Sequence, residues 1–254
     1  MSENDPFEKI TTWKPGMEWE TAIEELNHRK QTVKRMGGEE RIARQHGEGK
    51  QTIRERIVKL ADPGSFFEVG SIMGISQYDE NGDITGMTPA AFVTGLAEID
   101  GRQVTLGGED FTVRGGSPAG IHKDEVFFMH PMSLQYGIPC VQLKDGAGAN
   151  AGASEGRGRV PFPDGRFWCT DVELLHNVPV VSAIMGPTAG HVAGRSVFSH
   201  FSIMVKGSGQ IFPAGPPVVA RALSQDVKKN DLGGASIHTR VSGAVDNEAE
   251  NEDD

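Results

Sequence analysis

The placement of glycine is the sequence feature that most constrains how this chain folds. The sequence holds 33 glycines in 254 residues, and many of them lie between short apolar runs, at 107–108, 115–116, 146–158 and 233–234. Glycine at such places supplies positive φ angles, or lets the backbone approach a ligand or another element closely. The pattern predicts short strands joined by tight turns, as in a compact α/β domain.

Hydrophobic periodicity predicts the elements between these turns. We expect helices at 17–36, 52–61, 123–136, 167–176 and 216–223, and strands at 66–73, 91–99, 103–106, 139–143, 179–185 and 202–205. Asp100-Gly101 is a hairpin signal between two of the strands. Two strand–loop–helix units recur, at 139–176 and 179–198, with glycines after each strand. Open α/β sheets usually bind ligands at such strand ends.

Charge and cysteine content exclude several classes of protein. The formal net charge is −10, whereas nucleic acids and anionic membranes are bound by basic faces. The nine residues 246–254 carry six of the acidic side chains, so the rest of the chain is only mildly acidic. No signal peptide accompanies Cys140 and Cys169, which predicts reduced thiols and a cytoplasmic protein. No apolar run approaches the ~20 residues that span a membrane.

The chemistry indicated by the sequence is that of the backbone. Familiar nucleophile, phosphate-loop and zinc motifs are missing, and no Cys/His spacing suggests a metal site. Small residues follow an apolar strand at 145–149, and a similar turn occupies 185–190. Successive N–H groups in such a turn can stabilise an enolate or another oxyanion. A plain strand-to-helix turn remains the alternative interpretation of both segments.

Several stretches together resemble a known family. They are 49–57 (GKQTIRERI), 62–66 (DPGSF), 101–104 (GRQV), 110–117 (DFTVRGGS), 211–219 (IFPAGPPVV) and 231–239 (DLGGASIHT). In their residues and in their order along the chain, these stretches resemble the N-terminal lobe of the carboxyltransferase (beta) subunit of biotin-dependent acyl-CoA carboxylases. The resemblance runs from about residue 49 to residue 246.

The resemblance implies an α/β fold of the crotonase/ClpP-like type, a superhelix of repeated ββα units. On this basis we expect an N-terminal helical arm at 1–62, an acyl-CoA-binding lobe at 63–245, and an acidic linker or junction to a second lobe at 246–254. Family members move CO₂ from carboxybiotin, held on a carrier protein, to the α-carbon of an acyl-CoA. The resemblance implies that the biotin ureido group is the base, so no enzyme base need be visible.

The resemblance also implies site residues. The family loop Asp-Ser-Gly-Gly-Ala-Arg is Asp145-Gly146-Ala147-Gly148-Ala149-Asn150 here, so Ala147 and Gly148 are the expected oxyanion donors. The family's Gly-Pro-Cys-Ala-Gly-Gly is altered to Gly-Pro-Thr-Ala-Gly-His at 186–191, and Arg195-Ser196 follow. The expected substrate-binding residues are Arg54, Arg56, Arg114, Gly115, Gly116, Lys123, Gly146, Gly186 and Gly190, with the four cations for the CoA phosphates.

The implied partners are acyl-CoA, a second carboxyltransferase lobe or subunit, a biotin carboxyl carrier protein and biotin carboxylase. We also expect a homo- or hetero-oligomer, and no metal, nucleic acid or membrane. Because only one lobe is present, we predict no carboxylase activity from the chain by itself. Two alternatives stay open. One is a biotin-independent acyl-CoA isomerase, hydratase or decarboxylase, with Glu155 as its candidate carboxylate. The other is a non-catalytic assembly subunit with the same fold.

Overall fold

The computed structural model describes residues 10–117, 128–148 and 165–254 of the chain, with the side chains of 165–167 left aside. Its helices are α1 (Trp19–Lys34), α2 (Glu39–Gly47), α3 (Ile53–Leu60), η1 (Arg114–Gly116), α4 (Met129–Tyr136), α6 (Gly165–Asn177), α7 (His191–Val197), α8 (Pro216–Leu223), α9 (Lys229–Gly233) and α10 (Ala235–Arg240). Its strands are β1 (Phe67–Val69), β2 (Gly74–Tyr78), β3 (Ile84–Pro89), β4 (Phe92–Ile99), β5 (Arg102–Glu109), β6 (Cys140–Gly146), β7 (Val180–Ala189), β8 (Phe201–Val205), β9 (Gln210–Phe212) and β10 (Asn247–Ala249).

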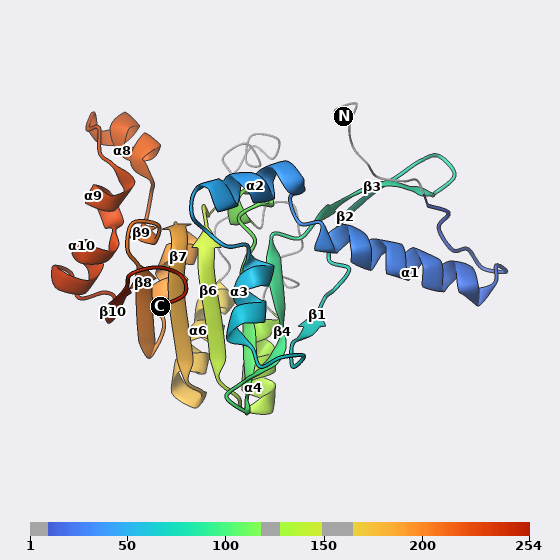
Figure 1. Ribbon diagram of the computed structural model, residues 1–254, viewed down its shortest axis with the longest axis horizontal. Coiled ribbons are helices and arrows are strands. Elements are labelled where there is room, and N and C mark those ends of the chain that lie inside the picture. The colour runs from blue at the N-terminus through green and yellow to red at the C-terminus, as the bar shows by residue number, and fades with distance from the viewer. Residues whose placement is uncertain (1–9, 118–127, 149–164) are drawn as a thin grey trace.

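A mixed sheet forms the centre of the molecule. Its strand order is β1-β4-β5-β6-β7-β8-β10, with β9 paired to β7. The pairs from β5 to β8 are parallel, while β1, β4 and β5 pair antiparallel. Helix α3 covers one face, α4 and α6 cover the other, and α2 lies across the upper ends of the strands (Figure 1). Because the parallel strands run in one direction, the glycine-rich segments that follow them meet at one edge of the sheet.

The predicted hairpin between β4 and β5 is confirmed. Ile99 pairs with Arg102, and both turn residues have positive φ, 50° at Asp100 and 71° at Gly101. This is the type I′ geometry that matches the twist of the flanking strands. The Asp62 carboxylate accepts hydrogen bonds from both turn amides, at 3.0 and 2.8 Å, and so ties the hairpin to the end of α3.

Helix α3 packs into the main core although we expected it to belong to an arm. A capping box of Thr52 and Glu55 begins the helix, and Ile53 and Ile57, each 1% exposed, join the core between the sheet and the helix. Helix α1 does extend from the body, beside the separate β2–β3 hairpin (Figure 1). Within the expected arm of 1–62, α1 therefore extends from the body, whereas α3 is part of the core.

The C-terminal segment forms part of the sheet. We expected an acidic linker or junction at 246–254, and within it Asn247–Ala249 forms strand β10, parallel to Ile203–Val205 of β8. The Asp246 carboxylate accepts a hydrogen bond of 2.7 Å from the Ser202 N–H. The division of the chain at residue 246 stays a prediction. Asp246 and strand β10 themselves pair with β8 of the lobe. None of the described helices combines the length and apolar character needed to cross a membrane.

Candidate active site

Three glycine-bearing turns meet beyond the carboxyl ends of β5, β6 and β7. The Gly115 carbonyl accepts a 2.8 Å hydrogen bond from the Ala147 N–H, which joins the turn after β5 to the turn after β6. A Cβ atom on Gly116 would lie only 2.6 Å from the Asp145 carbonyl oxygen. Backbone therefore packs directly on backbone at this edge, as the glycine pattern predicted.

Strands β6 and β7 are equally close near their carboxyl ends. A Cβ atom on Gly186 would lie 1.9 Å from Asp145 Oδ1, and one on Gly148 would lie 2.5 Å from the Ala189 carbonyl oxygen. Gly146 is tight against a flexible neighbour, since its Cβ would come within 2.9 Å of Glu109 Cγ. The structure thus brings together five of the expected glycines: Gly115, Gly116, Gly146, Gly148 and Gly186.

The backbone donors differ from our expectation. The Ala147 N–H is engaged by the Gly115 carbonyl, so Ala147 does not offer a free oxyanion donor here. Gly148 has a φ of 78°, and within the described part of the chain no hydrogen bond from its N–H is found. Gly190, with a φ of 61°, donates its N–H to the Phe212 carbonyl at 3.2 Å. Of these three groups, the Gly148 N–H is the one without a hydrogen-bond partner among the described residues.

A buried carboxylate stands at the base of these turns. Asp145 is fully buried, and its Oδ2 accepts hydrogen bonds from Arg56 Nη1 at 3.0 Å and from Gln45 Nε2 at 3.2 Å. The Lys50 ammonium lies 3.5 Å from the same oxygen and 4.2 Å from the centre of the Phe111 ring. These cations compensate the charge that burial would otherwise disfavour.

Arg54 and Arg56 are held by carboxylates rather than directed to a ligand. Arg54 forms a paired hydrogen bond to Glu68, with both distances 2.8 Å. The Arg56 side chain is 1% exposed and is shared by Asp145 and Glu252. Burial alone would lower the pKa of the Arg56 guanidinium, but the hydrogen bonds to Glu252 and the charge of Asp145 raise it. Our expectation that these two arginines bind CoA phosphates does not fit this placement.

A different arginine group lies beside the glycine turns. Arg41 and Arg44 of α2 and Arg114 of η1 line a cavity of about 420 Å³ together with Phe111, Thr112 and Gly115. Arg44 is largely exposed and meets Glu48 at 3.6 Å, while Arg41 Nη1 donates to the Thr112 carbonyl at 3.4 Å. Three guanidinium groups around one cavity are suited to phosphate oxygens. Arg114 was expected here, whereas Lys123 and Glu155 lie outside the described residues.

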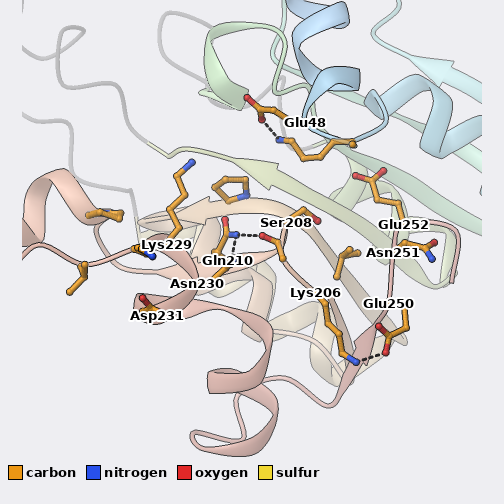
Figure 2. A pocket seen from close by; sticks show the side chains of 18 of the residues that line it. Glu48, Lys206, Ser208, Gln210, Lys229, Asn230, Asp231, Glu250, Asn251 and Glu252 are labelled. Carbon is orange, nitrogen blue, oxygen red and sulfur yellow. Dashed lines mark hydrogen bonds and ion pairs between the residues drawn. The ribbon is translucent and has the colours of Figure 1, made fainter.

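A larger cleft of about 1030 Å³ opens next to this network. It is lined by the α2–α3 turn, the β8–β9 turn, the start of α9 and the C-terminal segment. Figure 2 shows Glu250 and Glu252 on one side of the cleft and Lys229 and Asn230 on the other. Gln210 Nε2 donates to Asn230 Oδ1 at 2.7 Å, which fixes one wall. Lys50 and Glu252 belong both to this cleft and to the network around Asp145.

The burial and pairing of Arg56 were not predicted from the sequence, and Arg41, Arg44 and Glu252 were not identified at all, although a signal existed for Arg56. Arg56 follows Ile53 by three residues and precedes Ile57 by one, so helical spacing places it within the apolar stripe. Such an arginine is expected to be buried and paired. Arg41 and Arg44 lie on a helix with one strongly apolar residue, Ile42, and no periodicity marked that helix. Glu252 had no local signal, because its partner is 196 positions away.

Comparison with known proteins agrees with this architecture. Residues 44–254 match the family described as the carboxyl transferase domain. The chain is 35% identical over 236 residues to the methylmalonyl-CoA decarboxylase subunit alpha of Veillonella parvula, covering 91% of this chain and 45% of that protein. It is 34% identical over 234 residues to the mitochondrial propionyl-CoA carboxylase beta chain of Homo sapiens, covering 91% and 43% respectively.

A solved structure shows the same fold. The crystal structure of transcarboxylase 12S, with methylmalonyl-coenzyme A and methylmalonic acid bound, superposes with a TM-score of 0.79 at 32% identity. The match covers 95% of this chain and 46% of that chain, so the present chain spans about half the length of the relatives it matches. The crotonase-like α/β fold and the family resemblance are both confirmed: the chain belongs to the carboxyl transferase domain family.

Proposed function

We propose that this chain is the acyl-CoA-binding lobe of a biotin-dependent carboxyltransferase, which moves CO₂ between carboxybiotin on a carrier protein and the α-carbon of an acyl-CoA. The observation that carries the proposal is the meeting of three glycine turns around the Gly148 N–H, with an arginine-lined cavity alongside. A thioester and a polyphosphate occur together in acyl-CoA, and this arrangement offers one place for each.

The arginine cavity is the proposed anchor for the CoA phosphates. Arg41, Arg44 and Arg114 surround it, and Phe111 contributes an aromatic surface. Gly115 belongs both to this cavity and to the backbone contact with Ala147. A ligand held there by its phosphates would extend its thioester towards the turn at Gly146–Gly148.

The Gly148 N–H is the proposed oxyanion donor. When the α-proton of an acyl thioester leaves, negative charge develops on the thioester oxygen, and a fixed N–H group stabilises it. One such donor contributes roughly 100- to 1000-fold to turnover. Carboxybiotin, when bound, supplies the CO₂ and the group that takes the proton. Gly186, Gly190 and Gly116 would shape the pocket wall rather than donate.

The substrate and partners follow from the relatives. Because two relatives are named for propionyl-CoA and methylmalonyl-CoA, we place the substrate among short acyl-CoA thioesters. The remaining parts of the enzyme would be a second carboxyltransferase lobe, a biotin carrier protein and biotin carboxylase, in an oligomeric assembly. Both cysteines are free, which supports the cytoplasmic location expected from the sequence.

Calorimetric titration of the 254-residue chain with propionyl-CoA, methylmalonyl-CoA and free CoA tests the proposal. We expect binding of all three, weakened by Arg41→Ala and Arg44→Ala. Arg240→Ala, an exposed arginine on α10, is the matched control and should bind as the unaltered chain does. Absence of binding by the folded chain would overturn the proposal and favour a non-catalytic assembly role. Substantial carboxyl transfer from carboxybiotin by this chain alone would refute our prediction that one lobe is inactive.

A further inference from the structure

Glu252 reaches the base of the candidate active site from the far end of the chain. Its Oε2 accepts a 2.9 Å hydrogen bond from Arg56 Nε, although the two residues are 196 positions apart. The Arg56 and Glu252 side chains are 1% and 4% exposed, and Asp145 is 0% exposed. This ion-pair cluster of Arg56, Asp145 and Glu252 is therefore closed to water on nearly every side.

The geometry uses the planar fork of arginine. Nε and Nη2 of Arg56 both bind the Glu252 carboxylate, while Nη1 binds Asp145 Oδ2 at 3.0 Å. One rigid guanidinium thus fixes the relative position of two carboxylates, which a lysine ammonium cannot do with the same directions. Since Glu252 occupies two of the donors, only one edge of Arg56 remains for Asp145.

Asp145 transmits this position to the glycine turns. Arg56, Gln45 and Lys50 all act on Oδ2. The other oxygen, Oδ1, has no hydrogen-bond partner within the described residues and lies against Gly186, in the space that a Cβ atom would occupy. A displacement of the carboxylate would therefore act on β7 at Gly186 or carry with it β6, which ends at Gly146.

We propose that Glu252 and Arg56 are positioning residues, which hold Asp145 so that the turn after β6 directs the Gly148 N–H at the thioester oxygen. The inference rests on the proposed function, and no residue of the cluster is given a chemical step. When a neutral side chain replaces Glu252, Asp145 is the one carboxylate of the cluster left to pair with the Arg56 guanidinium. The guanidinium and the carboxylate then rearrange, and the two strand ends lose their fixed separation.

Glu252→Gln tests this with a change of charge at constant shape. The adjacent Asp253→Asn is the matched control, because Asp253 makes the same kind of contact, to Lys59, at an exposed position. Amide hydrogen exchange on the ligand-free chain is the first readout. We expect faster exchange in residues 140–148 and 180–190 of Glu252→Gln, unchanged exchange in residues 92–99, and no local effect of Asp253→Asn. Arg56→Lys should reproduce the Glu252→Gln pattern.

Ligand binding is the second readout. In Glu252→Gln the preference for propionyl-CoA over free CoA should fall about threefold to tenfold, as expected for one lost hydrogen bond, while the affinity for free CoA is kept. The infrared band of the bound thioester carbonyl should return towards its position in solution. The inference would be overturned if Glu252→Gln changed the exchange rates of 140–148, 180–190 and 92–99 by the same factor or left all of them unchanged. It would also be overturned if the preference for propionyl-CoA over free CoA stayed the same. If the unaltered chain binds no thioester, the proposed function fails, and hydrogen exchange still decides whether Glu252 holds the turn.

Discussion

Replacing Gly186 by alanine tests how tightly the two strand ends are packed. The added methyl carbon would lie 1.9 Å from Asp145 Oδ1 and 2.3 Å from its Cγ. Ordinary contacts are longer by more than about 1.5 Å, so one of the strand ends must move. The Asp145 carboxylate cannot simply turn away, because Arg56 Nη1 holds its other oxygen at 3.0 Å and the side chain is fully buried.

The expected cost follows from this contact. Overpacking a tight site costs about 1–3 kcal/mol, and 1 kcal/mol changes Tm by about 2–4 °C in a chain of this size. We therefore expect Gly186→Ala to lower Tm by about 2–12 °C in differential scanning calorimetry. The same variant should bind propionyl-CoA more weakly, because the turns that shape the proposed pocket are displaced.

Gly47→Ala is the matched control. Gly47 is the last residue of α2, and a Cβ atom there meets nothing within 4 Å. Alanine is favoured over glycine in a helix by up to about 1 kcal/mol, so its Tm should be unchanged or slightly raised. Equal Tm values for the two variants would refute the reasoning, since the packing of Gly186 against Asp145 would then carry no cost.

The remaining predictions concern buried groups away from the turns. His130 lies beside Asp171 and Arg195, and burial, followed by the charge of Arg195, lowers its pKa from 6.5 to about 3. As pH falls, His130 takes up a proton in the unfolded chain before it does so in the folded chain. Its contribution to the free energy of unfolding is therefore complete above pH 6.5, and the free energy of unfolding decreases by up to ~1.4 kcal/mol per pH unit below that. Urea unfolding at pH 7, 6 and 5 should show a smaller decrease for His130→Gln than for the unaltered chain or for exposed His46→Gln, and equal slopes would contradict this. For the cysteines, burial raises the pKa of the Cys140 thiol, whereas Cys169 is exposed. A thiol reagent should label one site in the native chain and two in denaturant, Cys169→Ser should remove the fast reaction, and two fast sites would show that Cys140 is accessible.

Local patterns predicted the parts of the fold that depend on local chemistry. Asp100-Gly101 specifies its turn by two positive φ angles, and the apolar runs at β6 and β7 are long enough to be recognised as buried strands. Helix α2 and the strands β9 and β10 were not predicted from the sequence. They are short or contain few apolar positions, and neighbours distant in sequence stabilise them.

The site was predictable to a smaller extent. The glycines of the turns were identified correctly as places of close backbone approach, since only glycine avoids the contacts at Gly116 and Gly186. Which N–H groups remain available depends on tertiary pairing, and the Gly115 carbonyl that engages Ala147 lies 32 positions earlier in the chain. Likewise, the residue type of Arg56 is evident from the sequence, whereas its two partners are not.

The pairing of Arg56 with Glu252 also sets an order on folding during synthesis. Helix α3 emerges early from the ribosome, yet its buried guanidinium gains its second carboxylate only after residue 252 has emerged. A buried ion pair that lacks one partner is destabilised by about 3–5 kcal/mol, comparable to the stability of a whole domain. Closing α3 over the sheet is therefore less favourable for the growing chain until residue 252 has been made. Burial of the Arg56 guanidinium is therefore coupled to a residue made 196 positions later in the chain.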